Sequence, residues 1–389
     1  MKKSSFAAKF FSSIYLLLNL LAIVWLLLCK WASIYDPASN PTILSLVSFS
    51  CFFAALANLI FLISWLFSRR KLRSLLSLIA FVACWDIVTP LFAFNFLGKN
   101  NIKATDEQGL KIMTWNVHLF DLGEWTKDKT SRAKILNLIQ EESPDILCLQ
   151  EFYWDEKNSQ EPYTAILQQL GYPFVKFSKE NGMFKTYITR NARKDEVIAT
   201  GHAIFSKYPL RNDQVYELKS AGYNMLSTEV VIDSSHIFSI NVVHLTSVGF
   251  GGKEMDYIEE VRQKGVEAQD ESKSKYLLKK LRDASATRAI LANQIDSLKR
   301  RMDYPLIICG DFNDVPSSYV YQKVRGKLSD AFIGKGQGFG RTYQHIFPTL
   351  RIDYILYDSE WLKIEGYKSP YVGLSDHYPV IANFSFPKL

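Results

Sequence analysis

The 389-residue chain has few cysteines, and none of them is arranged as a metal site. The five cysteines are widely spaced, with no CxxC pair and no cluster of cysteine with histidine, which argues against structural zinc. Cys29, Cys51 and Cys84 lie in apolar runs of the first third, and Cys148 and Cys309 lie in short strand-like runs. We therefore expect all five to be small buried hydrophobic residues.

The part of the chain after residue 99 also lacks a net excess of basic residues. The formal net charge is +7, but residues 1–99 supply all of it, and the remainder holds equal numbers of basic and acidic residues. The pI of about 8.9 therefore reflects residues that flank apolar runs. It is no evidence for a domain that grips many backbone phosphates.

Three long apolar runs occupy the first 97 residues. They cover residues 10–29, 43–67 and 74–97, and only Asp86 interrupts the third. Each is long enough to cross a hydrocarbon core of about 30 Å as a helix rising about 1.5 Å per residue. A cleaved signal peptide would account for the first run but not for the other two. We predict a membrane anchor of three transmembrane helices over residues 1–97, with three buried soluble helices as the alternative.

Basic residues predict the orientation of these helices. Three lysines lie in the first nine residues, and SRRKLRS (68–74) separates the second and third runs, whereas the loop 30–42 holds one lysine. Lysine and arginine favour the cytoplasmic side of a membrane. Three crossings then place everything after Leu97 outside the cytoplasm, in a multi-pass protein of the cell membrane.

Asp86 is an unusual residue for a membrane segment. An acid at the centre of such a helix costs roughly 2.5–3.5 kcal/mol on insertion scales. We expect Asp86 to contact Asn19 or Asn58 of another helix or to face water, with a functional polar site as the alternative.

Residues 98–109 are polar and predict a linker, and residues 110–389 have the composition of a soluble domain. Helical and strand patterns alternate at both ends of this domain, with strand after strand between them. This order predicts two packed sheets covered by helices, an α/β (α+β) fold. The predicted strands are 110–117, 146–150, 197–206, 225–232, 237–243, 306–309, 352–357 and 380–386, and the predicted helices are 131–142, 163–170 and most of 249–301.

Polar side chains mark the ends of these strands. Such groups at one edge of a packed core converge on one cleft, and carboxylates there repel one another unless a cation binds them. The oxygen donors Glu151, Asp311, Asn116 and Asp376, with no thiolate, suit Mg²⁺. The full set of polar residues at strand ends is Asn116, Glu151, His244, Asp311, Asn313, Asp353, Asp376 and His377.

Each of these positions alone also has an ordinary structural explanation. GDFND (310–314) could form a turn with an Asx hydrogen bond, and LQE (149–151) could end a strand on an exposed glutamate. His244 could be a satisfied core histidine, and Arg351 could pair with Asp353. Their joint occurrence in this order favours a functional site.

Seven short motifs carry these residues: TWNV (114–117), LQEF (149–152), GHAIFSKYPL (201–210), NVVHL (241–245), GDFND (310–314), IDYIL (352–356) and SDHYPV (375–380). Together they resemble the endonuclease/exonuclease/phosphatase superfamily, which includes the DNase I-like nucleases, and here in particular a membrane-anchored bacterial-type member. The resemblance implies a four-layer α/β/β/α sandwich of two mixed sheets, preceded by the three transmembrane helices. It also implies a site at one edge of the two sheets.

The resemblance implies a role for each metal-binding and water-activating residue. Glu151 looks like the main metal-binding carboxylate, with Asn116 beside it and Asp376 as a further acid near the metal. His377 looks like the group that activates the attacking water. Asp353 is similar to the acid that holds that histidine in the right tautomer.

The remaining roles concern the phosphate. Asp311 and Asn313 resemble residues that bind the phosphate region and orient the nucleophile, and His244 resembles the histidine that contacts the phosphate and can protonate the leaving oxygen. His118 stands where several nuclease members carry a second acid, which weakens any case for a second metal. The implied cofactor is Mg²⁺, with Mn²⁺ as an alternative.

The resemblance implies the reaction class, hydrolysis of phosphodiester or phosphomonoester bonds, and leaves the substrate open. A membrane anchor would hold the cleft near lipid head groups and raise their effective concentration. We therefore favour a membrane-tethered phosphoesterase acting on a lipid head group, a nucleic acid or a small phosphoester. An extracytoplasmic DNA or RNA endonuclease or exonuclease is the alternative, and a non-catalytic binding module is a third. The lipid bilayer is the expected partner, no protein partner is inferred, and 249–301 could overhang the cleft.

Overall fold

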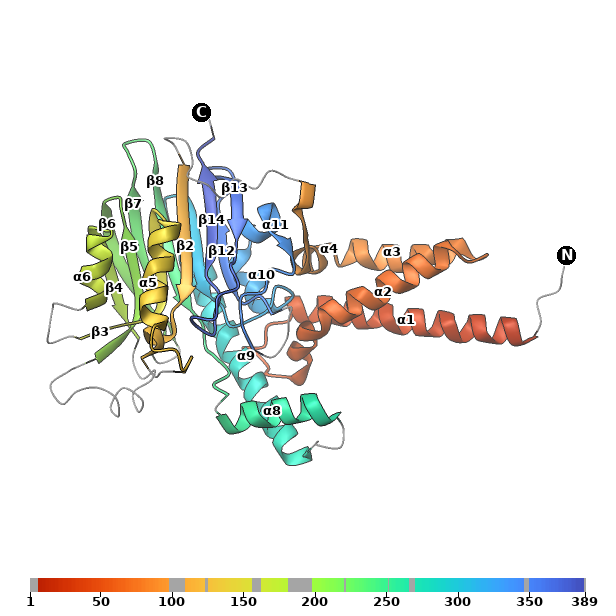
Figure 1. Cartoon of the computed structure of the whole chain (residues 1–389). Helices are drawn as coiled ribbons and strands as arrows, with labels where there is room; N and C mark the ends of the chain where they lie inside the picture. The colour runs from red at the N-terminus through yellow and green to blue at the C-terminus, as the bar shows by residue number, and fades with distance from the viewer. Residues whose placement is uncertain are drawn as a thin grey trace.

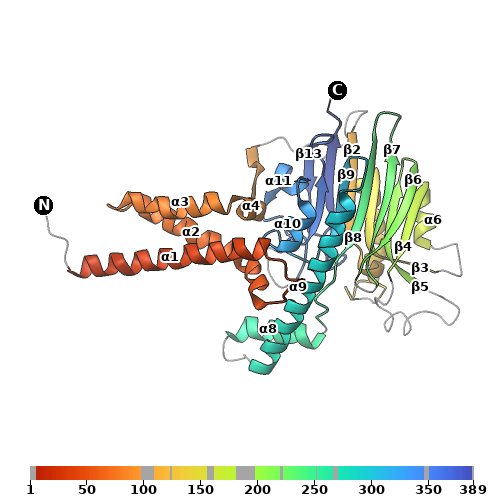
Figure 2. The same cartoon turned by 180° about the vertical axis from the view of Figure 1, so that it is seen from behind.

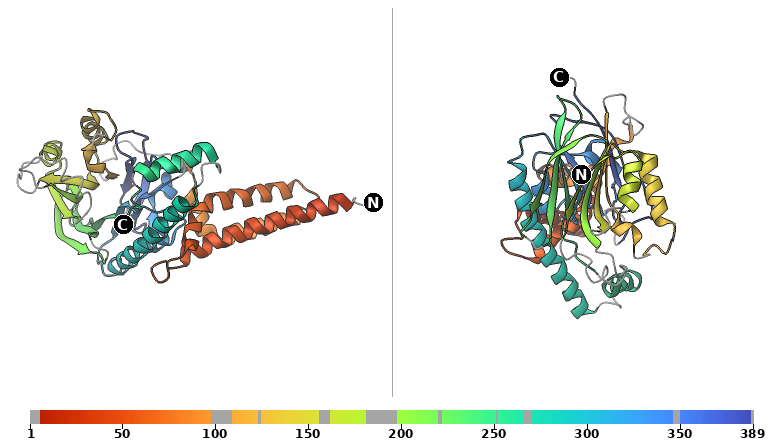
Figure 3. Two further views of the ribbon diagram at one scale, coloured as in Figure 1. Left: turned by 90° about the horizontal axis from the view of Figure 1, so that it is seen from below. Right: turned by 90° about the vertical axis from the view of Figure 1, so that its left-hand side faces the viewer.

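The computed structural model describes residues 6–97, 109–122, 125–155, 162–180, 198–219, 222–250, 252–265, 270–345 and 350–387. The predicted linker therefore lies almost entirely outside the described residues. Two six-stranded sheets pack face to face, and apolar helices project from one side of them (Figure 1). Viewed toward one edge of the sheets, helices cover both outer faces, which confirms the predicted sandwich of two mixed sheets (Figure 3).

The first sheet has the strand order β13-β14-β2-β3-β5-β4, and its one parallel pair is β2 with β3. Helices α5 (Ser131–Glu142) and α6 (Pro162–Gln169) cover its outer face. Its strands are β2 (Gly109–Asn116), β3 (Ile146–Asp155), β4 (Phe174–Lys179), β5 (Ile198–Ser206), β13 (Lys363–Lys368) and β14 (Val380–Ser385).

The second sheet has the order β10-β12-β9-β8-β7-β6, with β8 and β9 parallel. The long helix α9 (Glu271–Lys299) crosses its outer face beside α10 (Tyr319–Arg325), as Figure 2 shows from behind. α8 (Gly252–Lys264) precedes α9, and α11 (Ala331–Lys335) follows α10. The strands are β6 (Leu210–Glu217), β7 (Asn224–Val231), β8 (Ile237–His244), β9 (Leu306–Asp311), β10 (Ser329–Asp330) and β12 (Asp353–Tyr357).

The main core lies between the two sheets. Alternate residues of each strand face inward, because side chains of a strand point to opposite faces in turn. The inner layer includes Ile112, Cys148, Ile204, Val242 and Ile307, all fully or almost fully buried. All five cysteines are buried and unpaired, as the sequence predicted.

Two of the strands that the sequence did not single out, β6 and β10, have little apolar face. β6 is an edge strand whose residues are almost all exposed, and β10 has two residues. Polar edge strands limit edge-to-edge association between molecules. The alternation of apolar and polar residues that reveals inner strands is therefore absent from β6.

Two of the three predicted membrane helices have the expected length and composition. Phe10–Ile34, within α1 (Phe6–Ile34), and Ile43–Leu66, formed by η1 (Ile43–Ser50) and α2 (Cys51–Leu66), are long and apolar enough to cross a membrane. The third run is not one straight helix. It bends by 73° between Lys71–Ala83 and Trp85–Leu91, so it is a third span only if the bent pair counts as one.

The bend has a local cause and a consequence for packing. Cys84 leaves helical geometry, with φ −109° and ψ 18°, between α3 (Ser74–Ala83) and α4 (Trp85–Val88). The chain then turns onto the sandwich, where β1 (Ala93–Phe94) pairs with β11 (Gln337–Gly338). The last part of the predicted third span is thus a contact with the sheets.

Asp86 contacts neither Asn19 nor Asn58, so that part of the expectation was wrong, whereas the alternative of an exposed face agrees with the structure. It forms an ion pair with Lys30, at the end of the first apolar run, and its side chain is 41% exposed. Asn19 instead donates to Ser77 Oγ at 2.8 Å, which joins α1 to α3. Side-chain amides often hold neighbouring membrane helices together in this way.

Gly201 in β5 allows the close approach of β4. A Cβ at this position would lie 1.9 Å from the carbonyl oxygen of Ser178. We expect Gly201→Ala to force the two strands apart, and overpacking of this kind costs roughly 1–3 kcal/mol. The midpoint of thermal unfolding should fall by roughly 5–10 °C in circular dichroism.

Gly252→Ala is the matched control. Gly252 begins α8, and a Cβ there meets nothing within 4 Å. Alanine favours a helix over glycine, so this variant should unfold at or above the wild-type midpoint. An equal loss in both variants would show that the contact between β4 and β5 is not the cause.

Candidate active site

The predicted site residues meet at one end of the sandwich. Strands β2, β8 and β9 end there, and β12 begins there (Figure 1). The predicted strand end at Gln150 was wrong, because β3 continues to Asp155 and Glu151 lies at a bulge within it. Asp311 is the register partner of both His244 in β8 and Asp353 in β12. Pairing between strands therefore brings together residues that are 67 and 42 positions apart in the chain.

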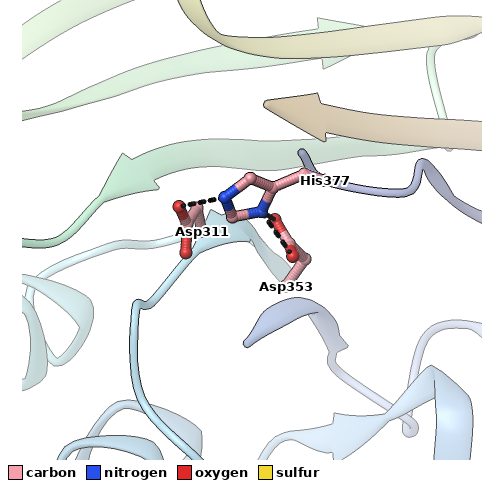
Figure 4. Close-up of side chains that lie close together, drawn as sticks. All are labelled: Asp311, Asp353 and His377. Atoms are coloured by element: carbon pink, nitrogen blue, oxygen red, sulfur yellow. Dashed lines mark hydrogen bonds and ion pairs between the residues drawn. The ribbon is translucent and has the colours of Figure 1, made fainter. Parts of the chain in front are cut away.

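His377 lies between two carboxylates (Figure 4). Its Nδ1 is 3.2 Å and 3.0 Å from the two carboxylate oxygens of Asp353, and its Nε2 is 3.6 Å from Asp311 Oδ2. The indole of Trp115 donates to the carbonyl oxygen of His377 at 2.9 Å, and the ring of Tyr343 packs edge-on at 5.0 Å. These contacts fix the backbone and the ring of His377, and Nδ1 is directed at Asp353.

The charges around His377 favour its protonated form. Burial lowers the pKa of His377, but the carboxylates of Asp353 and Asp311 outweigh burial and raise it well above the ordinary value. Burial raises the pKa of Asp311 to about 6, against the opposing charge of His377. The metal-free cleft therefore favours the imidazolium form of His377.

His244 has a buried carboxylate behind it. Its Nδ1 lies 3.5 Å from Glu180 Oε2, and its Nε2 lies 3.7 Å from both Glu151 Oε1 and Asp311 Oδ2. His202 faces the other oxygen of Glu180 at 3.4 Å. Burial lowers the pKa of His244, yet Glu180, Asp311 and Glu151 together raise it to about 9.

Glu151 offers an oxygen that fits a cation. Its Oε1 accepts from Asn116 Nδ2 at 3.1 Å, while Oε2 is buried and has no hydrogen-bond partner among the described residues. An unpartnered buried carboxylate oxygen is costly unless a cation binds it. Burial raises the pKa of Glu151, and the charges of His118 and His244 oppose this.

The backbone explains why LQE presents its glutamate to the cleft. The register of β3 against β5 shifts between Leu149 and Phe152, and Glu151 has a left-handed φ of 50°. Such bulges re-aim side chains and are common beside active sites. The alternative of an exposed glutamate is wrong, since the Glu151 side chain is 12% exposed.

Two sets of side chains could hold a divalent metal. Asp311, Asp353 and His377 place one ligand atom each within 4.8 Å of the others. Both nitrogens of His377, however, already face carboxylates. Glu151 and Asn116 fit a hard cation better, because their oxygens are what Mg²⁺ prefers and one is unpartnered.

Asp376 is held by a residue that the sequence did not point to as functional. Its Oδ1 lies 3.3 Å from His118 Nδ1, and Trp125 stacks on the His118 ring at 3.9 Å. Burial lowers the pKa of His118, and Asp376 outweighs this and raises it. Asp376 is one of the charges that raise the pKa of Glu151, so it borders the same cleft.

GDFND is both a turn and part of the site. The Asn313 N–H donates to Asp311 Oδ1 at 2.8 Å, which is an Asx turn. The Asn313 amide also donates to Asp311 Oδ2 at 3.0 Å and to the Leu245 carbonyl at 2.9 Å. The turn orients the carboxylate, so the structural explanation does not compete with the functional one.

Arg351 does not pair with Asp353, so that alternative is wrong. Its guanidinium bonds Asp330 Oδ2 at 2.7 Å in the interior. Asp353 is therefore available to pair with His377.

Sequence reasoning missed Glu180, His118 and Tyr343. Glu180 directly follows β4, so the same rule of polar residues at strand ends would have found it had β4 been recognised. His118 gave no signal beyond its place two residues after Asn116. The α8–α9 hairpin projects beyond this end of the sandwich (Figure 1), and its overhang of the cleft stays a prediction.

We expect Glu180 to keep the His244 ring protonated at neutral pH in the metal-free protein. Glu180→Gln removes the nearest negative charge, so the pKa of His244 should fall from about 9 toward neutrality. Ring ¹⁵N shifts of histidine-labelled protein, titrated with a chelator present, measure this.

His236 serves as an internal control, because it is paired with Asp233 on the surface turn before β8. Its titration should be the same in wild type and variant. Superimposable His244 curves in the two proteins would rule out Glu180 as the cause.

Comparisons with known proteins agree with this architecture. Residues 113–377 match the model of the Endonuclease/Exonuclease/phosphatase family, and residues 9–91 match a domain of unknown function (DUF8431). No curated protein matches the chain.

Two solved structures share the fold. The human Nocturnin catalytic domain, solved with bound sulfate anion, is 22% identical, with a TM-score of 0.51 over 72% of this chain and 96% of that one. An endonuclease/exonuclease/phosphatase from Beutenbergia cavernae is 18% identical, with a TM-score of 0.50 over 72% of each chain. The family match spans most of the chain and every predicted site residue. The chain therefore belongs to the endonuclease/exonuclease/phosphatase family, whose members are hydrolases that act on phosphoester bonds.

Proposed function

We propose that the protein is a membrane-tethered, Mg²⁺-dependent phosphoesterase in which His377 activates a water for in-line attack on phosphorus. One arrangement carries the proposal: His377 lies between Asp353 and Asp311 in the cleft that also holds Glu151, whose Oε2 has no partner among the described residues. On this reading residues 1–97 are the anchor, 98–109 the linker and 110–389 the catalytic domain.

Glu151 and Asn116 would hold the Mg²⁺ ion, with Asp376 close by and Mn²⁺ as an alternative metal. A bound divalent ion neutralises negative charge on the non-bridging oxygens of the phosphate. The side chains suit such an ion, because they are oxygen donors and no thiolate lies among them.

Asp353 and His377 would act as one unit. Asp353 holds the proton on Nδ1, so Nε2 is the nitrogen that can accept a proton from water. Asp311 and Asn313 would orient that water and contact the phosphate region. A cation bound in the cleft would disfavour the protonated form of His377 and so lower its pKa. This effect is opposite to that of Asp353 and Asp311, which raise the pKa.

His244 would contact the phosphate and protonate the leaving oxygen. The acids around it raise its pKa to about 9, so it carries a proton to give at neutral pH. Glu180, beside Nδ1, would keep a proton on that nitrogen, so that Nε2 is the nitrogen that gives its proton.

The helices support tethering with the catalytic domain outside the cytoplasm. Arg73 donates to Ser12 Oγ at 3.1 Å, so the basic α2–α3 loop lies beside the start of α1. Both are remote from the sandwich (Figure 1). The basic segments therefore share one end of the bundle, as the positive-inside rule requires for a cytoplasmic side.

A lipid head group or another small extracytoplasmic phosphoester is the substrate class that tethering favours. A nuclease acting on extracytoplasmic DNA or RNA is the second candidate. The charge balance of residues 100–389 speaks against it, because nucleases that grip a backbone need clustered lysine and arginine.

The first test is hydrolysis by the full chain in detergent or nanodiscs. With Mg²⁺ we expect turnover of bis-p-nitrophenyl phosphate, and EDTA should abolish it. Glu151→Ala and His377→Ala should each lower kcat/KM by about 10²–10⁴-fold, as expected for a metal ligand and a general base. His236→Ala, on the surface, should leave the rate unchanged.

Plasmid DNA, RNA and a sphingomyelin-type lipid then separate the substrate classes. Turnover of plasmid DNA or RNA with none of the lipid would favour the nuclease. Full activity in Glu151→Ala or His377→Ala would contradict the roles given to them. A folded wild type with neither turnover nor metal affinity would indicate a binding module.

Orientation has its own test. We expect a reporter that works only in the cytoplasm to be inactive when fused after Leu389, and to be active when inserted in the loop 68–73. Activity at the C-terminal fusion would overturn the extracytoplasmic placement.

A further inference from the structure

The N-terminal helices touch the sandwich in several places, among them α9 and α10, where Asn293 Nδ2 donates to Asp36 Oδ2 at 2.8 Å and Gln322 Nε2 donates to the Asp86 carbonyl at 3.3 Å. Two further contacts differ in what they reach. In one, Asn95 Nδ2 donates to the carbonyl oxygens of Ile333 and Gly336 at 3.1 Å and 2.9 Å, beside the β1–β11 pair. In the other, the contacts go to the two segments that carry catalytic residues. Ser317 follows Asn313 by four residues, and Arg351 precedes Asp353 by two.

Arg351 links the helices to the start of β12. Its Nη2 donates to the Pro90 carbonyl at 2.9 Å, and its Nη1 bonds Asp330 Oδ2 at 2.7 Å. The side chain is buried, and its guanidinium carbon lies 4.4 Å from the ring centre of Phe332. A buried guanidinium needs its acceptors, so the Pro90 carbonyl belongs to the environment that fixes Arg351.

Ser317 links the helices to the loop after β9. Its buried hydroxyl donates to the Ser48 carbonyl at 2.7 Å, near the end of η1. A buried carbonyl that loses its donor is destabilised. Ser317 therefore ties the position of the GDFND turn to the position of η1.

The two segments are also joined to each other. The Phe312 N–H donates to the Ile352 carbonyl at 2.8 Å, and the Tyr354 hydroxyl lies 2.8 Å from the carbonyl oxygens of Asp314 and Arg351. A shift of either segment is thus passed to the other. Asp311 and Asp353, which flank His377, would move together.

Packing between the helices and these segments is incomplete. A cavity of about 270 Å³ lies between them, with Phe49, Phe52 and Leu91 on the helix side and Val315, Pro316 and Phe339 on the sandwich side. Ser317 and Arg351 also line it. The two sides still meet where Phe52 packs edge-on against Phe339, with ring centres 5.1 Å apart. A void leaves fewer dispersion contacts between the helices and the sandwich. The hydrogen bonds of Ser317 and Arg351 beside it therefore contribute a larger share of the attachment.

We propose that the N-terminal helices are a working part of the active site and not only a tether. Through Ser48 and Pro90 they hold Ser317 and Arg351, which act as positioning residues for Asp311, Asn313 and Asp353. The expected effect on catalysis rests on the proposed function. The expected effect on the position of these segments rests on the contacts alone.

Hydrogen exchange on the full chain in nanodiscs tests the structural part without any assay of activity. In Ser317→Ala and Arg351→Lys, peptides that cover 312–318 and 350–354 should exchange about tenfold faster or more, while α5 and β14 keep the wild-type rate. Arg351→Lys keeps the charge beside Asp330 but cannot bridge two acceptors as a guanidinium does. Asn95→Ala is the matched control, since it removes two bonds at the same junction that do not reach these segments.

Kinetics test the catalytic part. In both variants kcat for bis-p-nitrophenyl phosphate should fall by about 10–100-fold, as small displacements of catalytic groups do, with KM changed less than twofold. Asn95→Ala should stay within twofold of wild type in both parameters. Exchange and kcat equal to the control in Ser317→Ala would overturn the inference, whatever the state of Arg351→Lys.

Other outcomes are distinguishable. Faster exchange throughout the sandwich of Asn95→Ala as well would mean that docking only stabilises the fold, and would also overturn the positioning role. A wild type with no hydrolysis of any phosphoester would defeat the proposed function, while the exchange comparison would still decide whether the helices hold these segments.

Discussion

The site depends on the burial of ionisable side chains at one end of two sheets. Taking a carboxylate or an imidazolium out of water is costly unless another charge or a donor meets it. Here each buried group is met by a residue from a different strand: His377 by Asp353 and Asp311, and His244 by Glu180. The strand register that pairs Asp311 with both neighbours is therefore the condition for the whole arrangement.

The same constraint explains why the cleft is suited to a cation. Glu151 has one oxygen bonded to Asn116 and one with no partner in the described part of the chain. Glu151, Asp311 and Asp376 border the same cleft, and nearby histidines, among them His118, His244 and His377, offset part of their charge. Adding a divalent ion relieves repulsion that the fold alone leaves in place.

Much of this could be predicted from the sequence, because strand ends in a two-sheet sandwich share an edge. The apolar runs before Asn116, Glu151, His244 and Asp311 carried enough pattern to place all four residues at the edge of the core. The helix predicted at 131–142 is α5 residue for residue, since its apolar positions recur at helical spacing. Glu180 escaped because β4 has a mostly half-exposed pattern and so no clear alternation.

Partners from distant segments could not be predicted. Arg351 has Asp353 two residues away, yet it bonds Asp330 and the Pro90 carbonyl, which lie 21 and 261 positions distant. Asp86 likewise forms an ion pair with a residue distant in the chain, Lys30. For Arg351, spacing along the chain suggested Asp353, and for Asp86 the polar residues of other helices suggested Asn19 or Asn58. In both cases tertiary packing brought a different charged side chain into contact.

The direction in which the helices leave the sandwich bears on how a substrate arrives. The bundle extends sideways from the sheets, whereas the strand ends of the candidate site lie at a different side of the sandwich (Figure 1). If the helix bundle stood perpendicular to a bilayer, the opening of the cleft would face parallel to the membrane surface and not toward it. Water-borne molecules would then have unobstructed lateral access, and a lipid would have to lift its polar end clear of its neighbours before reacting.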